Sequence, residues 1–367
     1  MKSINLALLF IILIFTGCGS NGSTSTTQPQ TPSTLSVDGA PVLDTLQPTI
    51  FGVCGSGDKI SLLVDKEPLE LYATCENNTF SIKLDDNLTH KRYCFSAFAT
   101  SNNGIDSVLS EETCAFVGRA FITTWKTDNK GWQPADTVQI TIISSDAYNY
   151  DYNFSVDWGD GEYDIDVVES IKHTYEKAGI YTVKINGDFP IVSFFPINDF
   201  GKAEPADKLI ALNQWGSMPF ESMGFAFLDH NSTEFNATDI PNLSKVLNAR
   251  AMFASVSMTP KNINDWNVSN IEDMSHMFSR VIPSLDFDIS GWDVSSAKNL
   301  KGMFSHALSV LSYDKLLNAW SKLPLQQDVT FGAGSSQYSS ASKEARDKLI
   351  SDFNWTIIDG GCIGECG

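Results

Sequence analysis

The sequence is poor in positive charge and in histidine. Lys and Arg number 25 against 44 Asp and Glu, so the 367-residue chain carries a formal net charge of −19, and it has five His. Nucleic acid and anionic lipid surfaces would be repelled by this excess of acid, so neither is expected as the main partner. The 23 Phe, 10 Tyr and 8 Trp need burial, which excludes a chain that is disordered throughout.

Motifs of catalysis and nucleotide binding are also missing. The sequence contains no His-Glu-x-x-His, no Gly-x-Ser-x-Gly and no nucleotide-binding fingerprint. A Ser–His–Asp set need not be close in sequence, so its presence is not decided by motifs. We expect a protein without catalytic residues and without a cofactor.

Long hydrophobic runs are absent beyond the N-terminus. Residues 6–15 are all apolar, but ten helical residues rise only about 15 Å, half of a bilayer core. Residues 1–17 are therefore expected to be a signal peptide. Small residues precede Cys18, and this ending resembles a bacterial lipobox, which implies lipid attachment at Cys18. An ordinary signal peptide followed by a chance Cys is the alternative.

The segment that follows the proposed anchor has almost nothing to bury. Ten of the residues from 19 to 36 are Ser or Thr, and none is charged. Such a segment cannot offset its ordering entropy by burial, so residues 18–36 are expected to form a flexible tether. Gly19 stands where an Asp would retain an enteric-type lipoprotein in the inner membrane, which favours the outer membrane.

Six cysteines remain after Cys18, and an even number in a secreted chain indicates disulfides. Six cysteines allow 15 pairings, and proximity in sequence favours three of them. A metal site is the rival interpretation, but no Cys-x-x-Cys is present and only His90 lies near these residues. The favoured pairs are Cys54–Cys75, Cys94–Cys114 and Cys362–Cys366.

Residues 37–117 alternate between apolar and polar side chains in short runs separated by turn clusters. This pattern is typical of an all-β sandwich. The order of the runs resembles bacterial immunoglobulin-like domains, with Ile-Phe-Gly-Val-Cys at 50–54 opening the unit. The strand-like runs are residues 59–64, 79–84 and 93–99.

Residues 119–190 form a second β unit. Asp160-Gly161 lies between apolar runs, which is a hairpin signal because both residues tolerate positive φ. Trp-Gly-Asp-Gly at 158–161, His-x-Tyr at 173–175 and Gly-x-Tyr-x-Val at 179–183 resemble a polycystic-kidney-disease (PKD) domain. Such domains act as spacers or as sites of protein and glycan contact.

Six carboxylates fall within residues 157–169, and hard cations need several oxygen ligands at once. The weak calcium candidate consists of Asp157, Asp160 and Glu162. Alternating acids from 162 to 166 would share one exposed face of a strand, and this solvated face is the favoured interpretation. A carboxylate pair for glycoside hydrolysis is less favoured still, because nothing in the pattern forms a cleft.

An internal repeat begins near residue 209. Phe227, Phe253, Phe278 and Phe304 are 26, 25 and 26 residues apart, and Trp266 and Trp292 keep the same period. One unit of this size cannot bury its own apolar residues, so the copies are expected to stack into a continuous ladder.

The two clearest copies, at 263–278 and 289–304, carry Trp-Asn/Asp-Val-Ser followed by Met/Leu-x-x-Met-Phe. This pattern resembles the BspA-like bacterial surface proteins with leucine-rich-type repeats. Trp215 lacks the Val-Ser that should follow it, and Pro241 replaces the Trp of the second copy, so the repeat count stays at three to four. Helices at 313–323 and 342–353 and a strand at 355–358 are expected in a C-terminal cap.

The sequence thus predicts a mainly β chain, with two immunoglobulin-like β-sandwich domains before a leucine-rich-type solenoid at 191–310 and a helical cap at 311–367. The resemblance implies a lipid-anchored, surface-exposed adhesin that binds a protein or glycan ligand. A periplasmic scaffold and an accessory carbohydrate-binding protein are the alternatives. The candidate contacts are Asp265, Asn267, Asp293 and Lys298.

Overall fold

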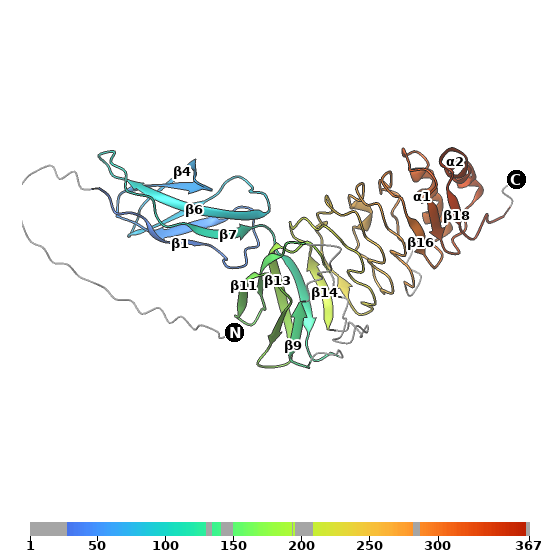
Figure 1. Ribbon diagram of the computed structural model, residues 1–367, viewed down its shortest axis with the longest axis horizontal. Helices are drawn as coiled ribbons and strands as arrows, with labels where there is room; N and C mark the ends of the chain where they lie inside the picture. The colour runs from blue at the N-terminus through green and yellow to red at the C-terminus, as the bar shows by residue number, and fades with distance from the viewer. Residues whose placement is uncertain are drawn as a thin grey trace, which may run out of the picture.

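The computed structural model describes residues 28–129, 134–140, 150–192, 194, 208–281 and 287–364. Within them the protein is mainly β, with eighteen strands in five sheets and two α-helices. Figure 1 shows three parts in chain order: an N-terminal pair of sheets, a second group of sheets, and a stack of turns that ends at the two helices. No helix in the described residues has the length and apolar character needed to cross a bilayer.

The N-terminal part consists of two sheets packed around their own core. Alternation decides which side chains face inward: Ile60, Leu62 and Val64 of one strand are buried, and the residues between them are more exposed. One sheet has the order β1-β2-β5 and the other β4-β3-β6-β7. The strands are β1 (Ser33–Val37), β2 (Thr49–Val53), β3 (Lys59–Val64), β4 (Glu67–Thr74), β5 (Thr79–Lys83), β6 (Lys91–Thr100) and β7 (Thr113–Val117).

Two disulfides close this part, Cys54–Cys75 and Cys94–Cys114, the pairings that proximity favoured. The third expected pair is Cys362–Cys366, and Cys366 lies outside the described residues. Cys18 and the signal peptide also lie outside them.

The folded chain starts earlier than composition indicated, so the tether boundary at residue 36 was wrong. Strand β1 begins at Ser33 and pairs with β2, with Val37 opposite Ile50. Backbone pairing needs no apolar side chain, which is why a Ser/Thr-rich segment could join a sheet. Leu35 packs against the core, and its carbonyl accepts a hydrogen bond from Thr113 Oγ1 at 2.9 Å.

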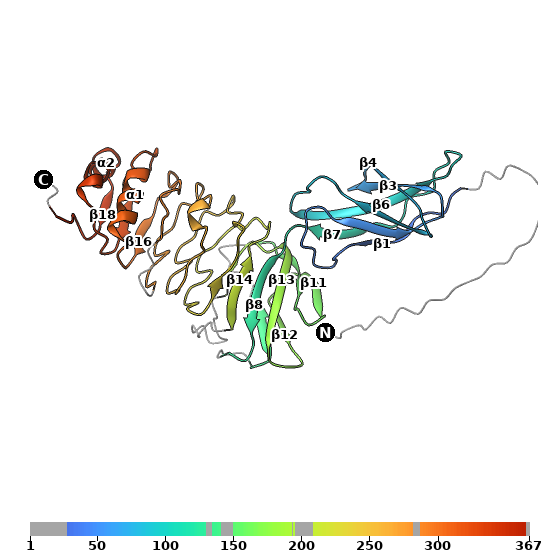
Figure 2. The same cartoon turned by 180° about the vertical axis from the view of Figure 1, so that it is seen from behind.

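The second part is built on a six-stranded sheet with the order β11-β10-β13-β8-β14-β15, and a two-stranded sheet pairs β9 with β12. Strands β14 and β15 belong to the segment expected to start the repeats, yet β14 pairs directly with β8. Figure 2 shows β14 beside β8. The strands are β8 (Phe121–Lys126), β9 (Thr137–Ile140), β10 (Asn153–Asp157), β11 (Tyr163–Val167), β12 (Ile171–Thr174), β13 (Ile180–Asp188), β14 (Leu209–Gln214) and β15 (Glu234–Phe235).

The repeat copies, numbered 1 to 4 by Phe227, Phe253, Phe278 and Phe304, stack through a repeated ladder of backbone hydrogen bonds. The Phe N–H of copies 1 to 3 donates to a Met carbonyl of the next copy, at 2.9 Å (Phe227 to Met252), 3.0 Å (Phe253 to Met277) and 2.9 Å (Phe278 to Met303). The four Phe rings lie 5.8, 5.9 and 5.5 Å apart between centroids and are nearly parallel. The expected apolar ladder is therefore present.

The C-terminal part closes the stack with parallel strands in the order β16-β17-β18 and with the two helices. Ser309 caps the first helix by accepting a hydrogen bond from the Ser312 N–H, so the helix starts three residues before the expected position. Its buried residues include Trp320. The elements are η1 (Ile263–Asp265), β16 (Leu300–Phe304), α1 (Val310–Trp320), β17 (Thr330–Ala333), η2 (Ser340–Ser342), α2 (Lys343–Phe353) and β18 (Thr356–Ile358).

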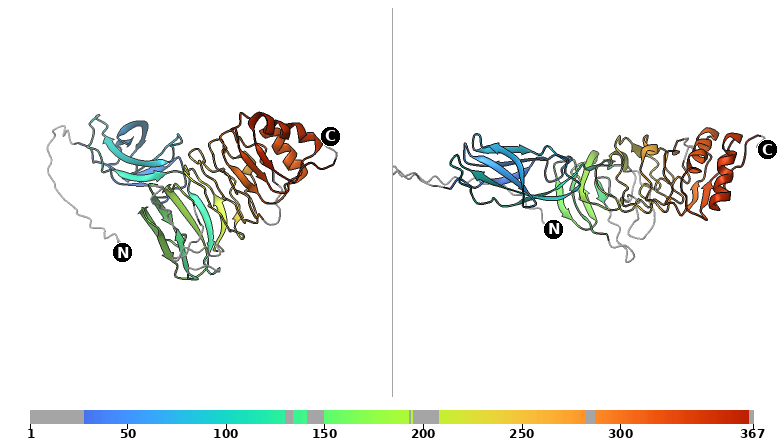
Figure 3. Two further views of the ribbon diagram at one scale, coloured as in Figure 1. Left: turned by 45° about the vertical axis from the view of Figure 1, so that its right-hand side comes forward. Right: turned by 90° about the horizontal axis from the view of Figure 1, so that it is seen from above.

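One hydrophobic core runs from Phe121 in the second part to Trp355 near the C-terminus. The three segments expected at 119–190, 191–310 and 311–367 therefore share a core rather than having one each. The N-terminal part has a separate core and meets the second part through polar contacts, among them the buried Asn186 amide, whose Nδ2 donates to Leu43 O at 2.9 Å. The right-hand view of Figure 3 shows the parts in a row, and its left-hand view shows the second part below the other two.

Candidate ligand-binding groove

Two rows of residues with left-handed backbone run across the repeat copies. The first row lies two residues before each Phe: Phe225 (φ 61°), Ala251 (52°), His276 (58°) and Gly302 (60°). The second row lies two residues after: Asp229 (63°), Ser255 (59°) and Arg280 (57°). This conformation costs a residue other than Gly roughly 1–2 kcal/mol, so the stack must hold it in place.

Hydrogen bonds to the next copy supply that support. The N–H groups of Phe225, Ala251 and His276 donate to the next copy at 2.8, 2.9 and 3.1 Å. The N–H groups of Asp229 and Ser255 do the same at 3.0 and 2.8 Å. The two rows are therefore fixed by the ladder.

A shallow groove of about 410 Å³ lies along these rows, and we refer to it as the basic groove. Its floor contains the buried Ala251 and Ala254. Gly302 beside it has no side chain, and a Cβ there would lie 2.8 Å from the His276 ring, so the glycine makes room for the imidazole. The groove lining includes Phe225, Arg250, Ser255, His276, Arg280 and Ser305.

The basic groove carries positive charge in a chain whose net charge is −19. Arg250 is half-buried and its Nη1 donates to Ser275 Oγ at 2.9 Å, while Arg280 is exposed. Among the described residues, neither arginine forms an ion pair within 4.0 Å of a carboxylate. The groove therefore offers two uncompensated guanidinium groups to an anion.

The contact residues expected from the sequence lie outside the lining of the basic groove. The Asn267 and Asp293 carboxamide and carboxylate oxygens each accept a backbone N–H two residues ahead, at 3.2 and 3.0 Å, as Asn242 does in copy 2. Lys298 Nζ lies 2.7 Å from Glu272 Oε1 of the preceding copy. Asp265 is exposed in η1. Asn267, Asp293 and Lys298 thus form turns or an inter-copy pair.

Sequence reasoning missed the groove because its residues share no chemical type. Phe, Ala, His and Gly occupy the first row, and none of them except Gly indicates positive φ. The variation itself was the available signal, since core positions of the same copies stay apolar while these positions change from copy to copy.

The acidic residues near the hairpin between β10 and β11 contact different partners. Asp160 Oδ2 lies 2.8 Å from His173 Nε2, Asp157 Oδ2 lies 3.6 Å from Lys184 Nζ, and Asp164 accepts from Trp158 Nε1 at 2.8 Å. Partial burial raises the pKa of the Asp160 carboxyl, but hydrogen bonds from His173 and the Glu162 N–H outweigh it and leave that pKa below its usual value. The calcium candidates Asp157, Asp160 and Glu162 are not gathered around one point.

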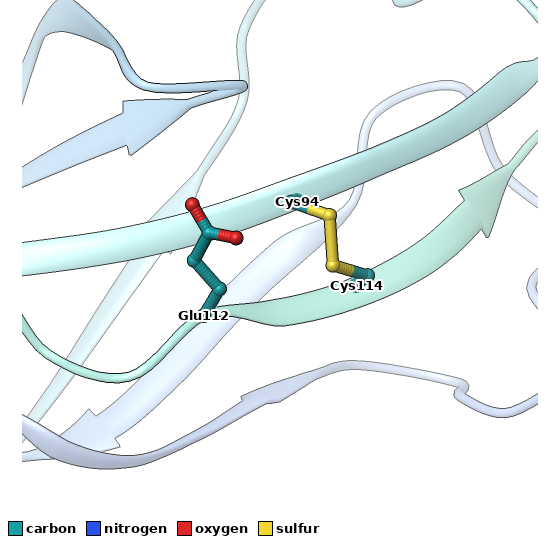
Figure 4. Close-up of side chains that lie close together, drawn as sticks. All are labelled: Cys94, Glu112 and Cys114. Carbon is teal, nitrogen blue, oxygen red and sulfur yellow. A yellow bond between two sulfur atoms is a disulfide. The ribbon is translucent and has the colours of Figure 1, made fainter.

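Within the described residues, one group of three metal-ligating side chains has its ligand atoms within 4.8 Å of one another: Cys94, Glu112 and Cys114. Figure 4 shows the Glu112 carboxylate beside the bond that joins the two sulfurs. Sulfurs in a disulfide are not thiolates and do not bind metal as such. This group is therefore structural.

A family described as "Mycoplasma protein of unknown function, DUF285" matches residues 221–336. The match spans less than half of the chain, and it contains the repeat copies and the whole lining of the basic groove. No curated protein matches the chain.

Two solved structures of α-L-rhamnosidases are similar to part of the chain. The enzyme from Dictyoglumus thermophilum is 9% identical, with 48% of this chain and 27% of the enzyme covered and a TM-score of 0.24. The Streptomyces avermitilis enzyme, complexed with L-rhamnose, is 11% identical, with 43% and 22% covered and a TM-score of 0.20. The chain spans about a quarter of these enzymes, and TM-scores this low carry no inference about fold or activity.

Proposed function

We propose that this chain is a lipid-anchored protein of the bacterial cell surface whose repeat stack binds a protein or glycan ligand. The basic groove is the observation that supports this most directly. It extends over several copies, it contains unpaired cationic side chains, and its shape is held by the inter-copy ladder. A rigid, preorganised surface of this kind suits recognition, because little ordering entropy is lost on binding.

We infer an adhesin-like architecture in which the two β units act as a stalk. The paired sheets around an independent core support an immunoglobulin-like N-terminal domain. The Asp160-Gly161 hairpin supports a PKD-like second unit, and the ladder with its 25–26-residue period supports a BspA-like solenoid with a helical cap. The protein binds rather than catalyses in this proposal.

Protease treatment of intact and permeabilised cells tests the proposed location. Digestion of the repeat region on intact cells, followed by immunodetection, is expected to remove the signal, because a surface-exposed stack is accessible from outside. A periplasmic marker protein should survive the same treatment. Protection of the repeat region until the cells are permeabilised would contradict the adhesin proposal and favour a periplasmic scaffold.

The anchor is tested by Cys18→Ser. We expect the membrane-bound fraction of the protein to fall by about tenfold or more, because the acyl chains that hold it would have no attachment point. The measurement is immunodetection in membrane and soluble fractions. Ser20→Ala, which leaves Cys18 intact, is the control and should stay with the membrane. Equal retention of both variants would contradict lipid attachment at this residue.

A further inference from the structure

The charge of the basic groove narrows the class of ligand. Arg250 and Arg280 lie on neighbouring copies, and neither has a carboxylate partner within the described residues. A guanidinium group binds a carboxylate through two parallel hydrogen bonds, which gives direction as well as attraction. An anionic ligand with carboxylates at more than one position fits this arrangement.

The remaining lining resembles a surface for sugar rings more than one for a peptide. Phe225 is 41% exposed, so its ring offers an apolar face, and Ser255 and Ser279 offer hydroxyls alongside the arginines. A peptide that binds by adding a strand would need free main-chain groups at a strand edge. In the first row the N–H groups of Phe225, Ala251 and His276 already donate to the next copy.

The spacing of the copies favours a polymer. The aromatic rings of successive copies repeat every 5.5 to 5.9 Å, a step comparable to the length of one sugar ring. A chain of sugars laid along the stack would therefore pass the same backbone positions at each copy, with side chains that differ from copy to copy. A single small molecule would use only a fraction of a groove that crosses copies 1 to 4.

We propose that the basic groove binds an acidic polysaccharide, with Arg250 and Arg280 each contacting a sugar carboxylate and Phe225 packing against a sugar ring. This inference rests on the proposed ligand-binding role of the repeats and names its substrate class. It does not depend on where the protein is displayed.

Binding of polygalacturonate oligomers to the full-length chain carrying Cys18→Ser tests this, with titration calorimetry as the measurement. We expect Arg280→Ala to weaken binding about tenfold, as removal of one charge-assisted pair does, and added salt to weaken it further. Lys322→Ala removes one exposed positive charge outside the groove and should bind as the parent does. Because Arg280 is exposed, its variant is expected to fold, and an unchanged melting temperature checks this.

Three outcomes would overturn the proposal. Equal affinity for fully methyl-esterified polygalacturonate would show that the carboxylates are not recognised. Tighter binding of polyglutamate would identify an acidic peptide as the ligand class. If none of these polymers binds, an acidic polysaccharide is not the ligand. Digestion of the repeat region on intact cells would still support the proposed surface location.

Discussion

Replacing Phe278 with Ala is expected to lower the free energy of unfolding by about 3–5 kcal/mol. The ring is buried and lies between those of Phe253 and Phe304, at 5.9 and 5.5 Å. Its loss leaves a cavity at two interfaces, and the ladder bonds on either side keep the copies from closing the gap. Denaturant unfolding followed by Trp fluorescence measures the change, with Trp292 6.0 Å from the ring as a nearby reporter.

Phe225→Ala provides the matched control for this substitution. Phe225 belongs to copy 1 of the same stack, but it is exposed in the basic groove rather than buried in the ring ladder. Its replacement should change the free energy of unfolding by about 0.5 kcal/mol or less. If both substitutions cost the same, stacking of the Phe rings is not what stabilises the copies.

Acidification from pH 6.5 to 4 is expected to remove about 3 kcal/mol of stability through His230 alone. Complete burial lowers the pKa of this imidazole to about 4, against an ordinary value of 6.5. As pH falls, the unfolded chain therefore binds a proton before the folded chain does. The stability that His230 contributes is fully present above pH 6.5, is lost between pH 6.5 and 4, and does not fall further below pH 4.

The test compares the wild-type chain with His230→Gln by denaturant unfolding at several pH values. In the folded protein His230 Nε2 lies 3.1 Å from the Phe194 carbonyl oxygen, and a Gln amide keeps a donor for that acceptor without a proton to gain. Burial also shifts the pKa of His90 downward and that of Asp188 upward, but both groups are present in the two proteins, so their effect cancels in the comparison. Equal loss of stability in the two proteins over this window would contradict the prediction.

The sequence was informative wherever one side of an element is buried. The alternation at residues 59–64 predicted β3 with both of its ends, because period-two burial leaves a direct trace in the residue order. The second C-terminal helix was expected at 342–353 and is found as α2 (Lys343–Phe353), ending at Asn354 in the left-handed conformation. The repeat period likewise located the stacked Phe rings.

The sequence was uninformative where function depends on backbone shape. Asn267 and Asp293 are exposed and polar, as expected, but only the structure shows that their oxygens are occupied by nearby N–H groups. Phe225 and His276 adopt positive φ because hydrogen bonds to the next copy impose it, and neither residue type predicts that conformation. The pairing of β14 with β8 crosses the expected boundary at residue 190, and this contact between distant segments likewise could not be predicted from local sequence.

The hydrogen-bond ladder between the copies also determines how we expect the protein to respond to mechanical load. Hydrogen bonds that run from each copy to the next lie in series along the stack, so a pull on its C-terminal end is carried by every interface in turn. The C-terminal part pairs with copy 4 through β16 and β17 and has the stack on one side alone, so we expect it to open first and the shortened stack to remain intact behind it. At the other end, the Cys54–Cys75 and Cys94–Cys114 bonds keep the chain inside those loops from extending. Tension on the C-terminal end is thus expected to be released by unravelling from that end, while the disulfide-closed N-terminal part keeps its length.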